Sequence, residues 1–107
     1  MIARVWHGAT RADDADAYAA YLERTGMQSA RSLPGSRGTL VLRRIEGDRA
    51  EFETILLFES LSDVRAFAGD HIDRAVFFPE DDRFLVEREL DVSHYEADAV
   101  AQGPESG

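Results

Sequence analysis

The 107-residue sequence contains no cysteine, no lysine and no asparagine. Without cysteine the chain can form no disulfide, no thiolate metal site and no cysteine nucleophile. Without lysine all 12 basic residues are arginines, and 21 acidic residues outnumber them to give a formal net charge of −9. Such a surface repels phosphate groups, so we expect no binding to nucleic acid or membranes. Without asparagine, any oxyanion must be held by main-chain N–H groups or by other polar side chains.

The chain length predicts a single domain, because about a hundred residues can bury one core but not two. Neither a basic stretch leading into an apolar run nor a small-residue cleavage site follows Met1. We therefore expect neither secretion nor membrane spanning, and a cytoplasmic protein. We expect the domain to cover residues 1–96. The small, polar segment 97–107 is predicted to be a disordered tail.

The first half of the sequence predicts one strand and one helix. Ile2–Ala9 is apolar and strand-like, with Trp6 on one face and Val5 and His7 on the other. Helical spacing of apolar residues follows within Arg11–Gly26, where acidic residues gather near the start and the glycine is expected to end the helix.

The second half predicts a hairpin, a helix and a last strand. Thr39–Glu46 and Arg49–Glu59 are apolar runs joined by a glycine-bearing turn, which favours an antiparallel hairpin. Ser60–Gly69 has a capping serine with an aspartate three residues on, and a glycine at its end, as a helix requires. Asp70–Val76 could add one capped turn, and Phe84–Glu96 is expected to be one long strand.

The order β-α-β-β-α-β predicts an α+β, ferredoxin-like fold with a four-stranded antiparallel sheet and two helices on one face. Ile55 and Leu57 point away from the face that carries Leu56 and Phe58, because successive side chains of a strand alternate. The second face therefore needs a cover. A second copy of the chain provides one, so we expect a two-fold symmetric homodimer.

With this order of elements, FESLSDVRAFAGDH (Phe58–His71) resembles the strand-to-helix segment of the antibiotic biosynthesis monooxygenase superfamily. The resemblance covers about Ile2 to Glu96, including DADAYAAYL and the terminal SHYE. It implies a dimeric α+β barrel. The superfamily includes cofactor-independent oxygenases of aromatic polyketides, quinol oxygenases and haem-degrading enzymes. Phe58 stands at the family's tryptophan position, Phe67 at its helix histidine, and Trp6 at the asparagine of the haem-degrading members, so haem degradation is the activity implied least.

The resemblance implies a cofactor-independent monooxygenase acting on a small aromatic or polyketide-type substrate. Such chemistry needs an apolar slot, a base or donor, and a group that holds the enolate. The expected catalytic residues are His71 and Arg4. The expected substrate-binding residues are Trp6, Tyr18, Phe58, Phe67, Val76 and Phe77. We expect no cofactor and no metal site.

Alternatives remain for each of these residues. His71 alone can be a surface histidine, and the aromatic residues can be plain core. An arginine at position 4 of an inner strand must pair with an acidic residue or face a cavity, and pairing is the expected outcome. The acidic run Glu80–Asp82 fits a solvated turn. The alternative function is a non-catalytic dimeric barrel that binds a small apolar ligand or serves as a structural partner.

Overall fold

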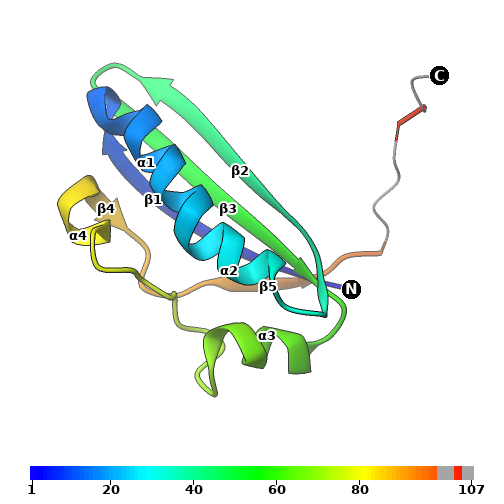
Figure 1. Ribbon diagram of the computed structural model, residues 1–107. Coiled ribbons are helices and arrows are strands. Elements are labelled where there is room, and N and C mark those ends of the chain that lie inside the picture. Colours follow the sequence, from blue (N-terminus) through cyan, green and yellow to red (C-terminus); the bar gives the residue numbers. More distant parts are fainter. Residues whose placement is uncertain (99–102, 105–107) are drawn as a thin grey trace.

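The computed structural model describes residues 1–98 and 103–104. The strands are β1 (Ile2–Arg11), β2 (Ser36–Glu46), β3 (Arg49–Phe58), β4 (Leu85–Arg88) and β5 (Ser93–Glu96), and the helices are α1 (Ala15–Leu22), α2 (Gln28–Arg31), α3 (Leu61–Ala68) and α4 (Asp81–Phe84). Figure 1 shows α1 and α2 lying along one face of the antiparallel sheet, with α3 at one end of it and α4 beside β4. The α+β, ferredoxin-like prediction is confirmed. Most of the predicted tail lies outside the described residues.

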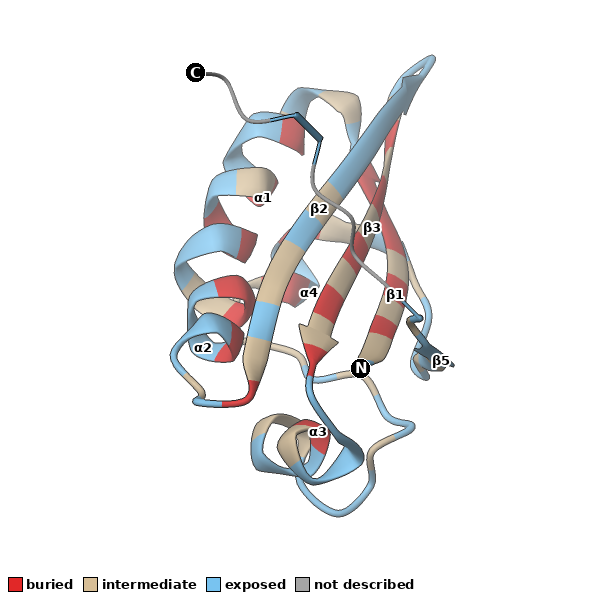
Figure 2. Cartoon of the chain, turned by 90° about the vertical axis from the view of Figure 1, so that its right-hand side faces the viewer, coloured by how far each residue is buried: buried red, intermediate tan, exposed pale blue. Residues whose placement is uncertain are grey.

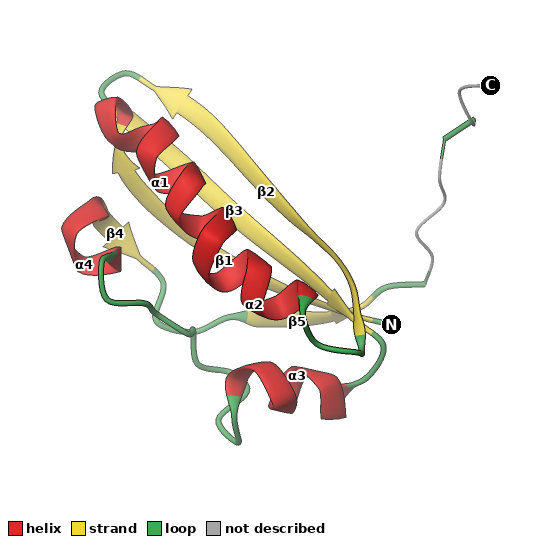
Figure 3. Ribbon diagram, in the orientation of Figure 1, coloured by secondary structure: helices red, strands yellow, loops and turns green. Residues whose placement is uncertain are grey.

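The sheet order is β2-β3-β1-β4, and β5 also pairs with β1. The prediction of one long last strand is therefore wrong. β4 pairs with β1 near Gly8, whereas β5 pairs with β1 from Ile2 to Val5. Between them the chain pairs elsewhere: Ala75 N–H donates to Leu90 O (2.9 Å) and Val92 N–H donates to Asp73 O (2.8 Å). The last strand is split because its middle pairs with a different segment (Figure 3).

The first helix runs further than the sequence predicts. Gly26 does not end it, because a π-helical segment, Glu23–Met27, joins α1 directly to α2. Gly26, Met27 and Ala30 are buried, so continued packing on the sheet keeps this part of the chain helical. No helix of the described part is long and apolar enough to cross a membrane.

The predicted caps of α3 are confirmed. The Ser60 side chain accepts a hydrogen bond from the Asp63 main-chain N–H, and Gly69 ends the helix at φ +79°, a conformation that glycine adopts without strain. The further helical turn predicted over Asp70–Val76 does not form. This segment runs as irregular chain instead, held by the pairing of its residues 73–75 with residues 90–92.

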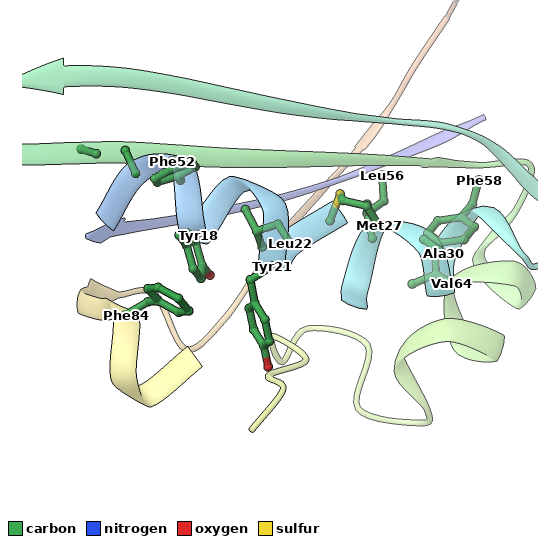
Figure 4. Close-up of a cluster of buried hydrophobic side chains, with 12 residues drawn as sticks. Tyr18, Tyr21, Leu22, Met27, Ala30, Phe52, Leu56, Phe58, Val64 and Phe84 are labelled. Atoms are coloured by element: carbon green, nitrogen blue, oxygen red, sulfur yellow. The ribbon is translucent and has the colours of Figure 1, made fainter. Parts of the chain in front are cut away.

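The core lies between the helices and one face of the sheet. Along β3 buried and half-buried residues alternate strictly, as expected for a strand with one covered face (Figure 2). Figure 4 shows Tyr18 of α1 between Phe52 of β3 and Phe84 of α4, with ring centroids 5.1 and 5.4 Å away. Phe84 was predicted to begin the last strand, but it ends α4 and points into this core.

All four helices contribute to that one core, so they all pack on the same face of the sheet. We call the opposite side the open face. Its larger apolar residues include Val5 on β1, Leu40 and Leu42 on β2, Ile55 and Leu57 on β3, and Tyr95 on β5. Leu40, Leu42 and Tyr95 are exposed. His7 also lies on the open face, where its Nε2 is 3.0 Å from Glu51 Oε2.

Candidate functional site

A cavity of about 50 Å³ lies between the sheet, the helix that runs from α1 into the π-helical segment, and the irregular segment that follows α3. Its apolar lining includes Trp6, Leu56, Phe67, Val76, Phe77 and Phe78. Its polar lining is Arg4, Tyr18, Thr25, Thr54 and Asp81. A mostly apolar and aromatic cavity with a few polar groups is typical of a small-molecule site. The volume is small, because a cavity that holds benzene measures ~150 Å³.

Trp6 forms one wall of the cavity. Its indole lies against Gly8, where a Cβ atom would come within 2.4 Å of the ring, so the strand needs glycine at this position. The indole N–H donates to the Glu89 carbonyl at 2.8 Å, in the interruption between β4 and β5. The ring of Phe77 meets Trp6 edge-on, with centroids 6.1 Å apart. The split in the last strand therefore helps to fix the orientation of the indole.

Arg4 is 3% exposed and lines the same cavity. The sequence predicts an acidic partner, but the described residues give it main-chain partners: it donates to Ile72 O and, at 2.7 Å, to Arg74 O. Carbonyl groups of the irregular segment thus replace a carboxylate. Burial lowers the pKa of Arg4, and the charge of Asp73 opposes that shift. A guanidinium remains protonated at any physiological pH, so the cavity has a fixed positive charge.

His94 assists Arg4 from outside the cavity lining. Its Nε2 lies 3.1 Å from Arg4 Nη1. Because a guanidinium can only donate, Nε2 must accept, which leaves the histidine proton on Nδ1, 3.7 Å from Asp73. Burial and the charge of Arg4 lower the pKa of His94, and Asp73 opposes them. The neutral form that accepts from Arg4 is therefore favoured.

Tyr18 and Asp81 form a buried polar pair in the cavity wall. The Tyr18 hydroxyl donates to Asp81 Oδ1 at 2.9 Å, and the Phe78 main-chain N–H donates to Asp81 Oδ2 at 2.7 Å. Asp81 is only 4% exposed, so the prediction of a solvated turn at Glu80–Asp82 fails at its central residue. Burial and the Asp81 charge raise the pKa of Tyr18. Tyr18 therefore keeps its proton and remains a donor to Asp81.

The structure brings six of the predicted site residues to this cavity and leaves two outside it. Those that line it are Arg4, Trp6, Tyr18, Phe67, Val76 and Phe77. Phe58 is fully buried in the core, where its ring packs on Phe67, 5.9 Å between centroids. His71 is exposed and lies in a surface hollow with Asp70 and Asp73, two residues after Gly69 ends α3.

Sequence reasoning missed Asp81, and it missed Thr25 and Thr54 as cavity residues. Asp81 had no distinguishing signal within its acidic run. Thr54 could have been found, because it shares the buried face of β3 with Leu56, where a polar residue is unusual.

No family model matches the sequence, and no curated protein matches it significantly. Solved structures do match. A candidate antibiotic biosynthesis monooxygenase from Nitrosomonas europaea has a TM-score of 0.64 at 14% identity, covering 92% of this chain and all of the other. Another from Bacillus cereus has a TM-score of 0.65 at 12% identity, covering 98% of each chain. The chain has the antibiotic biosynthesis monooxygenase fold. The resemblance stated from the sequence is confirmed at this level.

A third similar structure contains a porphyrin, so its ligand can be compared with the size and lining of the cavity here. An arginine-to-serine variant of MhuD, with two manganese protoporphyrin IX molecules per active site, has a TM-score of 0.58 at 16% identity and covers 96% of this chain and all of the other. Here the cavity lining contains no histidine, and about 50 Å³ is far too small for a porphyrin. Haem therefore does not fit this cavity. No three His, Asp or Glu side chains among residues 1–98 and 103–104 are grouped so as to hold a metal ion.

The ring of Phe77 takes up space at the wall of the cavity, against Trp6. We expect Phe77→Ala to bind the two-ring compound 2-naphthol about tenfold more tightly than the parent protein, because the lost ring makes room for two further carbon-sized groups at ~0.8 kcal/mol each. Isothermal titration calorimetry measures the two affinities. Val86→Ala, a truncation at an exposed position outside the lining, is the control and should leave the affinity unchanged. Equal affinities in the parent and Phe77→Ala would show that Phe77 does not limit the cavity.

Proposed function

We propose that this protein is a cofactor-independent monooxygenase of small aromatic substrates, and that the cavity is its active site. The observation that carries the proposal is the buried Arg4, which lines an aromatic cavity and is bonded to main-chain carbonyl groups rather than to a carboxylate. An uncompensated buried charge is costly unless the site uses it. The fold similarity supports the same class of reaction, although fold alone does not determine function.

In this proposal each part of the cavity has one task. The rings of Trp6, Phe67 and Phe77 hold the substrate ring and exclude water. Ionisation of the substrate hydroxyl makes the ring electron-rich. Arg4 stabilises the negative charge that then develops on the substrate oxygen. Its two carbonyl hydrogen bonds hold the guanidinium in place before the reaction, so little reorganisation is needed.

The reaction balances with O₂ as the only co-reactant. A phenol with a free para position plus O₂ gives a para-quinone plus water. One oxygen atom enters the ring as a carbonyl, and the other leaves as water with the hydroxyl hydrogen and the para hydrogen. The ring loses four electrons, and O₂ gains these four electrons. The cavity of about 50 Å³ must widen even for a one-ring phenol and far more for a larger polyketide, so one-ring phenols with a free para position are favoured.

Arg4→Met is expected to lower kcat/KM by about 10²–10³, the effect of losing one preorganised donor to a developing oxyanion. Oxygen uptake with a panel of phenols that have a free para position measures this. Arg4→Lys keeps a positive charge but loses the planar fork that reaches two carbonyl groups, so we expect an intermediate rate.

Two controls accompany this measurement. Arg65→Met changes an exposed arginine of α3 in the same way, and His71→Ala removes a side chain outside the cavity. Both are expected to retain full activity. Uptake no faster than in buffer for every substrate would exclude the oxygenase, and ligand binding without turnover would instead support the non-catalytic barrel.

We also propose that the open face pairs with a second copy of the chain. Its apolar residues lie on adjacent strands as one continuous surface, and three of them are exposed in the single chain. Such a surface is rarely left in contact with water. A two-fold axis through it would bury the same residues of both copies.

A further inference from the structure

The Tyr18–Asp81 pair already uses part of its hydrogen-bonding capacity within the protein. The hydroxyl proton of Tyr18 goes to Asp81 Oδ1, and Asp81 Oδ2 receives the Phe78 N–H. The pair has no proton left to offer. What remains are lone pairs on the Tyr18 oxygen and on the carboxylate, and both residues line the cavity. On this side the cavity can only accept hydrogen bonds.

The other polar groups of the cavity differ from this pair. Arg4 can only donate, and the Trp6 N–H is committed to the Glu89 carbonyl. The Thr25 hydroxyl donates to Tyr21 O at 2.6 Å. Thr54 can donate or accept. The lining therefore combines one fixed donor, Arg4, with two fixed acceptors, the Tyr18–Asp81 pair and the Thr25 oxygen.

We infer that the Tyr18–Asp81 pair selects ligands that carry a hydrogen-bond donor, so that the cavity takes hydroxylated aromatic rings in preference to rings whose only polar group is an acceptor. The inference rests on the proposed function, because it names the ligand class of the same cavity. The raised pKa of Tyr18 is consistent with it, because a tyrosine that keeps its proton remains committed to Asp81. A ligand with a donor gains a hydrogen bond to the remaining lone pairs of this pair, and a ligand without a donor does not.

The geometry also predicts how to reverse this selectivity. In Asp81→Asn, the side-chain oxygen must face the Phe78 N–H, because an amide NH₂ there would oppose another donor. The NH₂ group then faces Tyr18 and donates to its oxygen. The hydroxyl proton of Tyr18 is released from residue 81 and can point into the cavity. One substitution thus converts the acceptor side into a donor side.

The experiment measures the affinities of three one-ring ligands by calorimetry: phenol, toluene, which has nearly the same size but no polar group, and benzonitrile, which can only accept. Asp81→Asn is expected to bind benzonitrile about tenfold more tightly than the parent protein, the effect of one hydrogen bond. Toluene should be unchanged. Asp82→Asn removes the same charge from the neighbouring exposed carboxylate and should change none of the three affinities.

A second measurement does not depend on how Asp81→Asn folds. In the triple variant Arg4→Met, Thr25→Val, Thr54→Val the Tyr18–Asp81 pair is retained and the other side chains of the cavity that could bond a ligand are removed. Phenol should still bind about tenfold more tightly than toluene, and benzonitrile should bind no more tightly than toluene. Equal binding of all three ligands, or a folded Asp81→Asn variant without a gain for benzonitrile, would overturn the inference.

These outcomes can be told apart from a failure of the proposed function. Ligand preferences as expected with no oxygen uptake would retain the inference and remove the oxygenase. Oxygen uptake without the preference for phenol would do the reverse. Binding of none of the three ligands would remove the inference, and uptake with larger substrates would then test the oxygenase separately.

Discussion

Leu42→Arg is expected to convert a dimer into a monomer, so that the mass in solution falls from about twice the chain mass of 11.9 kDa to that mass. Leu42 lies on the open face of β2, opposite Glu53 of β3, and is 43% exposed in the single chain. In the proposed dimer an arginine at this position would be withdrawn from water, and even with Glu53 opposite it the loss of hydration costs several kcal/mol. Light scattering at micromolar concentration measures the mass.

Leu61→Arg is the matched control. Leu61 is 41% exposed, a fraction similar to that of Leu42. It is, however, the first residue of α3 and lies off the sheet. The same substitution there should leave the dimer intact. A parent protein that is already monomeric at this concentration, or the same loss of mass in both variants, would refute pairing through the open face.

Phe58→Ala is expected to lower the free energy of unfolding by about 3–5 kcal/mol, the usual cost of removing a buried phenylalanine ring. Phe58 ends β3, is fully buried, and packs with Val64 of α3 and the ring of Phe67 in the core. The cavity left behind cannot collapse easily, because β2 and β1 pair with β3 on both sides of this residue. Urea unfolding at one fixed protein concentration measures the change, since the stability of a dimer depends on concentration.

Phe77→Ala provides the comparison for that measurement. Phe77 is half-buried and lies on the irregular segment, so its loss should lower the free energy of unfolding by only about 1 kcal/mol. Equal losses for the two phenylalanines would mean that Phe58 is not the core residue described above. A small loss for Phe58 would mean that the end of β3 relaxes around the missing ring.

Local signals predicted most of the fold. The turn at Gly47 and the caps at Ser60 and Gly69 each depend on a few neighbouring residues, and each appears as expected. The predicted helix end at Gly26 is wrong, because a glycine ends a helix only when no tertiary contacts stabilise the helix beyond that glycine. Here the buried residues beyond it keep the chain helical.

The site was less predictable because it depends on pairing between distant segments. Arg4 received carbonyl partners from residues 68 and 70 positions away, which no local pattern encodes. Asp81 is buried because Tyr18, 63 residues earlier, donates to it. His71 was predicted to be catalytic from its residue type. It follows the end of α3 at Gly69 and lies outside the cavity lining. Residue type alone suggested candidates for the site, and contacts between distant segments determine which of these candidates line the cavity.

The interruption between β4 and β5 has a thermodynamic consequence. The residues that interrupt the strand pair with the irregular segment through Ala75 and Val92, and both of these residues line the cavity. A ligand too large for the cavity can enter only by moving this wall, which disturbs its pairing with the edge of the sheet. The affinity for large ligands and the stability of the sheet edge are therefore thermodynamically coupled. A change that stabilises the edge weakens the binding of large ligands, and the binding of a large ligand destabilises the edge by the same free energy.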